Sequence, residues 1–206
     1  IGQNVQKFDL QLYLRSRFID KGYKVSQIGT KKISGLFGLH PLPDFLFNTQ
    51  YSDVDKVYAF NRVMKDVSMQ EKPDVILLGI PDSLLPLNNK HRFSFGLYAY
   101  EIFNAVQPDF VITSLMANDG YNDEFYSEIS KMAKYKYNVN IDAYFVSQFC
   151  PLSNSIWSEK LSYVYLPRME LPKTEYKVYT TSDLNNDILF KQAEKKLLLY
   201  GKYEQY

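Results

Sequence analysis

Lys7 is the residue whose type and position most directly suggest chemistry in this chain. It follows a loop of small and polar residues, Gly2, Gln3 and Asn4, and begins a run of helical periodicity that ends near Gly22. The backbone amides at a helix N-terminus attract an anion, and a lysine beside them neutralises its charge. The order of strand end, loop and helix therefore predicts a phosphate-binding segment.

The segment departs from the phosphate-loop pattern G-x-x-x-x-G-K-[ST] at several places. Counted back from Lys7, Gly2 lies one place after the expected first glycine, and Gln6 replaces the second. Phe8 stands where the pattern has a magnesium-binding hydroxyl, and Asp9 brings a negative charge that repels phosphate. We therefore interpret the segment as a degenerate phosphate loop. Gly2, Gln6 and Lys7 are its candidate cofactor-binding residues, for ATP or GTP with magnesium, and no residue is assigned as a metal ligand.

The loops after the predicted strands supply the other candidate site residues. Gly29 and Thr30 follow the alternating run 23–28, and Asp82 follows the apolar run 75–79. Ligands of open α/β sheets bind outside the carboxyl ends of the strands, so these residues are expected on one rim with the lysine. Gly29 and Thr30 join the cofactor-binding set. Asp82 is the candidate catalytic residue, as a general base or a carboxylate facing a metal, although an aspartate after a proline also commonly forms a turn.

The elements that must position these residues alternate along the chain. Helices are expected near residues 7–22, 52–69, 95–106, 122–135 and 186–200, and strands near 23–28, 74–79, 110–115 and 141–148, with short β-like runs at 162–166 and 176–180. Strands separated by helices imply a mostly parallel sheet, here of five or six strands, covered on both faces. The predicted fold is a three-layer α/β/α domain of the phosphate-loop NTPase type.

Domain organisation follows from the same alternation. We predict one α/β domain over residues 1–206, with its core in residues 1–150 and edge strands plus a C-terminal helix in residues 151–206. A phosphate loop follows an apolar strand, and only Ile1 stands before Gly2. The expectation is therefore that a strand or a domain upstream of residue 1 completes the sheet.

Composition excludes several classes of function. The net charge is +1, from 24 basic and 23 acidic residues, so nothing favours a nucleic-acid or anionic-membrane partner. The single Cys150 and the distant His40 and His91 favour neither a disulfide nor a metal site. His40 is interpreted as a packing or backbone hydrogen-bonding residue, with a proton carrier as the alternative. Neither a transmembrane run nor a signal-peptide pattern occurs, which predicts a cytoplasmic protein.

Three stretches of the sequence carry a resemblance to a known family. They are GYKVSQIGTKKISGLFGLHPLPDFL at 22–46, PDVILLGIP at 73–81 and FGLYAYEIFNAVQPDFVI at 95–112. They resemble a family of peptide-maturation-system proteins, which are encoded beside ribosomally made, bacteriocin-like precursor peptides and radical-SAM or protease partners. The resemblance covers residues 2–148. It implies that the partner is the precursor peptide or a co-encoded maturation enzyme.

A more distant resemblance covers residues 7–30. This region is similar to the dethiobiotin-synthetase-like branch of phosphate-loop NTPases, in which a Gly-Lys-x-Thr loop begins the helix and a GYKVGQLGT-type phrase follows. Lys7 matches the loop lysine, and Gly29 with Thr30 matches the phrase. Leu78 stands where those relatives carry an acidic residue that helps to position magnesium. The resemblance thus implies a nucleotide site that lacks its metal partners.

Three functions are compatible with these observations. The first is a binding module of a peptide maturation system, with little or no catalytic activity. The second is an ATP- or GTP-dependent enzyme such as a ligase, kinase or NTPase, with Lys7 on phosphate and Asp82 on magnesium. The third is a structural dimerisation domain, suggested by the tyrosines of the C-terminal tail, Tyr200, Tyr203 and Tyr206.

Overall fold

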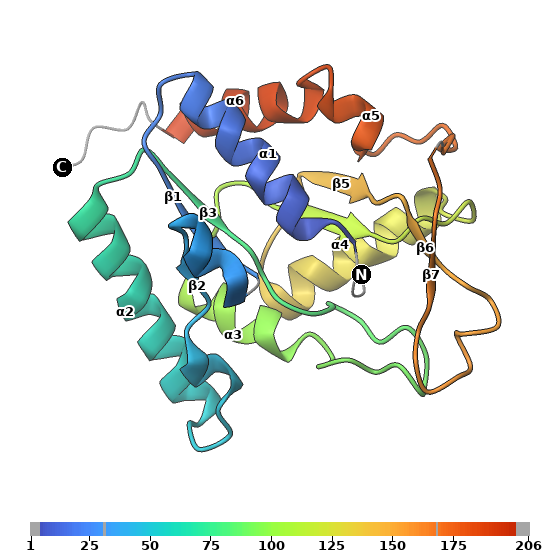
Figure 1. Cartoon of the computed structure of the whole chain (residues 1–206), viewed down its shortest axis with the longest axis horizontal. Coiled ribbons are helices and arrows are strands. Elements are labelled where there is room, and N and C mark those ends of the chain that lie inside the picture. The colour runs from blue at the N-terminus through green and yellow to red at the C-terminus, as the bar shows by residue number, and fades with distance from the viewer. Residues whose placement is uncertain (1–4, 31, 168, 201–206) are drawn as a thin grey trace. The chain divides into compact units, whose positions relative to one another are not determined.

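A computed structural model describes residues 5–30, 32–167 and 169–200 (Figure 1). The chain divides into two compact units, each of which is described by itself. The N-terminal unit comprises residues 6–84 and 93–107. The C-terminal unit comprises the described parts of residues 1–5, 85–92 and 108–206. The predicted single domain of residues 1–206 stays a prediction.

The N-terminal unit is built on a three-stranded parallel sheet of order β2-β1-β3. In its register Val25 lies opposite Val75, and Ile28 lies opposite Leu78. The elements in chain order are α1 (Lys7–Asp20), β1 (Val25–Gly29), the 3-10 helix η1 (Lys32–Phe37), β2 (His40–Pro41), the 3-10 helix η2 (Asp44–Phe47), α2 (Asp53–Glu71), β3 (Val75–Leu78) and α3 (Leu97–Ala105).

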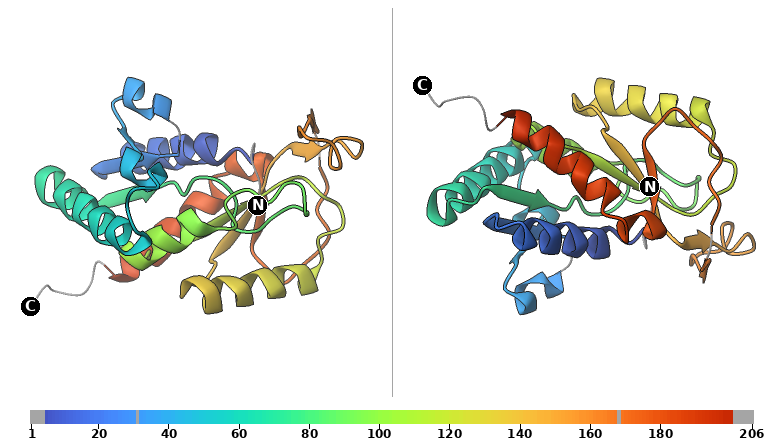
Figure 2. Two further views of the ribbon diagram at one scale, coloured as in Figure 1. Left: turned by 90° about the horizontal axis from the view of Figure 1, so that it is seen from below. Right: turned by 90° about the horizontal axis from the view of Figure 1, so that it is seen from above.

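Helices cover both faces of this sheet. Ile28 packs with buried residues of α2 and α3, namely Phe60, Ile102 and Ala105. The next residue, Gly29, points to the other face, where Phe8 of α1 lies close to it. Figure 2 shows α1 and α3 on opposite sides of β3. The ends of β1 and β3 therefore lie between the first turn of α1 and the helices of the opposite face.

Local signals explain where these helices begin and end. The Ser52 side chain accepts a hydrogen bond from the backbone amide of Asp55, which caps α2. At the other end Lys72 adopts a left-handed conformation before Pro73, which stops the helix. At the start of α1, Gln6 is left-handed with φ 51° and provides no side-chain cap. The amides of the first turn of α1 are thus not satisfied by a capping side chain of Gln6.

The C-terminal unit has a second three-stranded parallel sheet, of order β4-β5-β8. A separate antiparallel pair is formed by β6 and β7. The elements are β4 (Ile112–Leu115), α4 (Asp123–Tyr137), β5 (Ala143–Val146), β6 (Phe149–Pro151), β7 (Tyr163–Tyr165), β8 (Val178–Thr180), α5 (Thr181–Leu184) and α6 (Ile188–Tyr200).

Aromatic rings and one aspartate hold the C-terminal unit together. Tyr126 of α4 and Tyr144 of β5 are both 2% exposed, and their ring centroids lie 4.8 Å apart. Asp142, just before β5, accepts a hydrogen bond from the amide of Val111 at 2.9 Å and pairs with Lys196 of α6 at 2.5 Å. These contacts join α4 and α6 to the ends of β4 and β5 within the same unit.

The α/β class and the parallel pairing of the strands are confirmed. Each unit has its own three-stranded parallel sheet, and the predicted single sheet of five or six strands stays a prediction. The region 30–51, for which the sequence predicts neither a helix nor a strand, contains the parallel edge strand β2 and two 3-10 helices. In the described part of the chain, no helix has both the length and the apolar composition needed to cross a bilayer.

Candidate functional site

The candidate site lies in the N-terminal unit, where β1 and β3 end beside the start of α1. Lys7 is the first residue of α1, and its ammonium donates hydrogen bonds to the carbonyl oxygens of Ile80, at 3.2 Å, and of Asp82. Both carbonyls belong to the loop that follows β3. Lys7 and Asp82, which the sequence placed on one rim, are therefore in direct contact. Their roles in binding and catalysis stay predictions.

Burial determines the electrostatics of Lys7. Loss of hydration lowers the pKa of its ammonium to about 8, while the nearby Asp82 raises it. Desolvation is the larger effect, so the charged form is less favoured here than in water. A buried ammonium is stabilised by hydrogen bonds to acceptors that are already in place. The carbonyl oxygens of Ile80 and Asp82 are such acceptors.

Asp82 shapes the loop after β3 through both its backbone conformation and the hydrogen bonds of its side chain. Its φ of +59° is left-handed, a conformation that aspartate adopts more readily than most residues. Its Oδ2 accepts hydrogen bonds from the amide of Ser94 at 2.8 Å and from the Ser94 hydroxyl at 2.5 Å. Its Oδ1 is buried and has no hydrogen-bond partner among the described residues. Only one carboxylate oxygen therefore remains for any general-base or metal role.

Thr30 lies beside residues that the sequence did not single out. A Cβ at Gly79 would lie 2.5 Å from Thr30 Cγ2 and 2.6 Å from Gln11 Oε1, so both side chains press against the end of β3. The Gln11 amide donates to the carbonyl oxygen of Ile28 at 3.1 Å. Gln11 is four residues after Lys7 and hence on the same helix face. That spacing was the signal that could have identified it.

Gly29 is surrounded by side chains of its own unit. A Cβ there would lie 2.0 Å from Ser34 Oγ and 3.3 Å from Phe8 Cε2. Ser34 is fully buried, and its hydroxyl has no hydrogen-bond partner among the residues described. The small size of Gly29 is thus required by the packing of η1 against β1. Among the other predicted cofactor-binding residues, Gln6 lies at the start of α1, and Gly2 is outside the described residues.

A second polar cluster joins β1, β2 and α2. Glu71, the last residue of α2, accepts hydrogen bonds from the Ser26 hydroxyl and contacts His40 Nε2 at 2.5 Å. The hydrogen bond from Ser26 and the contact with His40 lower the pKa of Glu71. His40 thus has a carboxylate partner that the sequence did not reveal, and its role as a packing or backbone hydrogen-bonding residue or as a proton carrier stays a prediction. No group of three or more histidine, cysteine or acidic side chains suited to a metal ion occurs in the described part of the chain.

The pKa of Lys7 makes the stability of the N-terminal unit depend on pH. Its folded value of about 8 is lower than the ordinary value of 10.5, so above about pH 8 the unfolded chain binds more protons than the folded one. Stability should therefore rise with pH. We expect wild type to gain about 1 kcal/mol over Lys7→Met between about pH 7.5 and about pH 9. Urea unfolding followed by circular dichroism measures the difference. Lys21→Met, which removes an exposed lysine at the other end of α1, should show no such trend relative to wild type.

Comparison with known proteins yields no relative: no family model, no curated protein and no solved structure matches this chain.

Proposed function

We propose that this protein is a binding module of a ribosomal-peptide maturation system, in which an ancestral nucleotide site has become a structural contact. The observation that carries the proposal is the ammonium of Lys7, which donates to the carbonyl oxygens of Ile80 and Asp82. A phosphate-loop lysine must reach the β- and γ-phosphates of the nucleotide. Here two acceptors from the neighbouring loop hold the lysine instead.

The groups that would hold magnesium support the same proposal. Phe8 offers no hydroxyl after the lysine, and Leu78 offers no carboxylate at the end of β3. The Asp82 Oδ2 atom already accepts two hydrogen bonds from Ser94. Magnesium in such sites is held by a serine or threonine hydroxyl and an acidic residue. At these described positions the usual means to neutralise charge during phosphoryl transfer is therefore missing. The partner, a precursor peptide or a maturation enzyme, is inferred from the resemblance of residues 22–46, 73–81 and 95–112.

Calorimetry and thermal shift with the whole protein test this function. We expect saturable binding of the co-encoded precursor peptide or maturation enzyme by calorimetry. Mg-ATP and Mg-GTP should produce no shift of the melting temperature that depends on Lys7. The variants to compare are Lys7→Ala and the control Lys21→Ala. A nucleotide shift that Lys7→Ala abolishes and Lys21→Ala preserves would contradict the proposal, as would the absence of binding to both co-encoded partners.

A nucleotide shift that depends on Lys7 would favour the second proposal, an ATP- or GTP-dependent enzyme. The observation on its side is that Lys7 and Asp82 meet, and that Asp82 Oδ1 is buried without a partner in the described part of the chain. A nucleotide would have to displace the two carbonyls from the lysine. A third proposal, a dimerisation domain, rests on tyrosines of which Tyr203 and Tyr206 lie outside the described residues. A monomeric mass by light scattering would remove it.

A further inference from the structure

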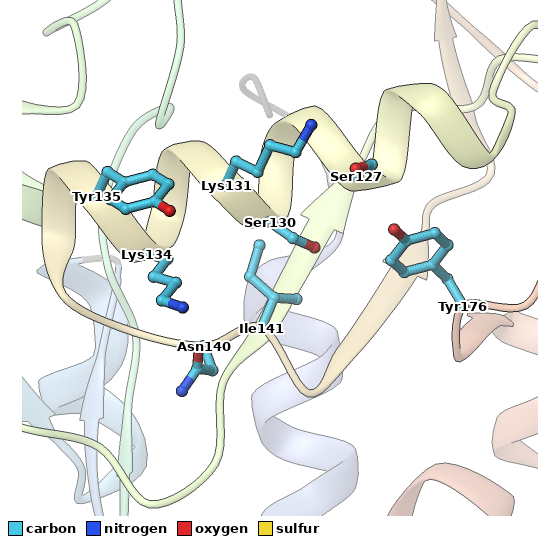
Figure 3. A pocket seen from close by; sticks show the side chains of 8 residues that line it. All are labelled: Ser127, Ser130, Lys131, Lys134, Tyr135, Asn140, Ile141 and Tyr176. Carbon is cyan, nitrogen blue, oxygen red and sulfur yellow. The ribbon is translucent and has the colours of Figure 1, made fainter.

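A surface hollow in the C-terminal unit has the composition of a binding site for an anion. It lies between α4 and the chain that leads into β5, and Tyr176 closes one side (Figure 3). Its volume is about 250 Å³. Lys131 and Lys134 contribute two ammonium groups from α4, and no carboxylate is among its lining residues. The lining residues therefore have a formal charge of +2, of which one charge is offset by Glu128, which lies outside the lining and pairs with Lys131.

Neutral hydrogen-bond donors accompany the lysines. The hydroxyls of Ser127 and Tyr176 and the side-chain amide of Asn140 also line the hollow. The hydroxyl of Ser130 is already used, because Tyr144 donates to the carbonyl of Tyr126 and accepts from Ser130. Ammonium, hydroxyl and amide groups together can satisfy the lone pairs of an oxyanion. The set is suited to an anion more than to a cation or a neutral amide.

The size and the apolar wall of the hollow narrow the class of ligand. Pockets for drug-sized ligands span about 300 to 1,000 Å³, so this hollow suits a single residue better than a nucleotide. Ile141 and the rings of Tyr135 and Tyr176 supply apolar surface beside the donors. A carboxylate on a short carbon chain matches both features. A peptide presents this group as an acidic side chain or as its C-terminus.

We propose that this hollow binds a carboxylate group of a peptide, with Lys134, whose ammonium points towards Asn140, as the charged contact and Lys131, whose ammonium points to the other side of α4, as a second charge at the rim (Figure 3). That the ligand is a peptide rests on the proposed function, whereas the preference for a carboxylate rests on the lining alone. Lys131 also pairs with Glu128 at 2.9 Å, through side chains that are 60% and 65% exposed. A pair so exposed contributes little, so Glu128 is only a weak competitor for the Lys131 ammonium.

Nuclear magnetic resonance titration of the whole protein tests the preference for a carboxylate. The probes are acetate, the peptide acetyl-Ala-Glu-Ala with a free C-terminus, the same peptide with an amidated C-terminus, and a matched peptide with glutamine in place of glutamate. The expected result is a saturable set of amide shifts confined to residues 127–141 and 176. A response to glutamate in the amidated peptide assigns the side chain, and a response only to the free C-terminus assigns the terminal carboxylate.

Substitutions of the lysines of α4 identify the site, and the control removes the same charge as the single variant. Lys134→Gln should weaken binding about tenfold, and Lys131→Gln with Lys134→Gln should abolish it, because charge-assisted hydrogen bonds are lost. Lys136→Gln is the matched control, since Lys136 lies on the same last turns of α4 and does not line the hollow. It should change binding by less than about twofold. Shifts that do not saturate, or binding that survives the double variant, would overturn the proposal.

Calorimetry with the co-encoded precursor separates this inference from the function on which it rests. If the precursor binds wild type and the double lysine variant equally, the binding function stands and the hollow is not its site. If neither co-encoded partner binds but acetate saturates the hollow, the proposed function fails and the carboxylate site stands.

Discussion

Lys56→Met is expected to lower the free energy of unfolding of the N-terminal unit by about 3–5 kcal/mol. The ammonium of Lys56 on α2 lies 3.1 Å from Glu101 Oε1 on α3, and the two side chains are 7% and 0% exposed. Methionine keeps most of the volume of lysine but leaves the Glu101 carboxylate buried without its cation. The loss therefore measures the cost of an uncompensated buried charge and not the net value of the pair.

The double variant Lys56→Met with Glu101→Leu separates these two quantities. It removes both charges, so most of the stability should return, as a direct comparison with wild type in urea measures. The matched control is Lys131→Met, which removes one partner of an exposed pair and should cost no more than about 1 kcal/mol. Hydrogen exchange of the α2 and α3 amides should show where the single variant opens.

The effect should also depend on pH. Burial already raises the pKa of Glu101, while Lys56 lowers it, so removing the ammonium raises this pKa further. A folded-state pKa above the unfolded value favours the protonated folded chain as pH falls. The deficit of Lys56→Met relative to wild type should therefore shrink towards acidic pH. A deficit that is constant with pH, or a double variant as unstable as the single one, would show that the buried charge is not the cause.

The elements of the fold could be predicted where the signal is local. Ser52 and the dipeptide Lys72-Pro73 delimit α2, and the apolar run Val75–Leu78 indicates a buried parallel strand. The pairing of strands could not be predicted in the same way, because alternation counts strands without saying which ones are neighbours. Strand β2 was missed since it has only two residues, His40 and Pro41, and no periodicity can show in so short an element.

The sequence could predict which loops meet at the candidate site, but not which atoms of those loops are in contact. The rule that ligands lie at the carboxyl ends of parallel strands placed Lys7 and Asp82 on one rim. It could not reveal that the lysine contacts the backbone carbonyl of Asp82 while the carboxylate turns to Ser94. Those choices depend on a left-handed backbone at Asp82, which no local pattern in the sequence specified. Glu71 and His40 are 31 residues apart, so their contact left no local trace either.

Gly29→Ala is expected to lower the free energy of unfolding by about 1–3 kcal/mol. The new methyl group would lie 2.0 Å from Ser34 Oγ and 2.8 Å from Ser34 Cβ, so η1 must move away from β1. Gly35→Ala is the matched control six residues later, because no atom lies within 4 Å of its Cβ position and its φ is not left-handed. That control should stay within about 0.5 kcal/mol of wild type in urea unfolding.

Second substitutions at Ser34 test whether the contact with Ser34 causes the loss of stability. They also test the alternative role of Gly29, which is to let a phosphate approach the backbone. Ser34→Ala removes the closer atom but keeps Cβ, so it should restore part of the stability that Gly29→Ala loses. Ser34→Gly removes both atoms and should restore more. In other words, Gly29→Ala should cost less stability in the Ser34→Gly background than in the Ser34→Ala background. If Gly29 served only to let a phosphate approach the backbone, its replacement by alanine would leave stability unchanged and Ser34 variants would rescue nothing. Stability that follows the order glycine, alanine, serine at position 34 would instead assign Gly29 to the packing of η1, as the contacts with Ser34 and Phe8 require.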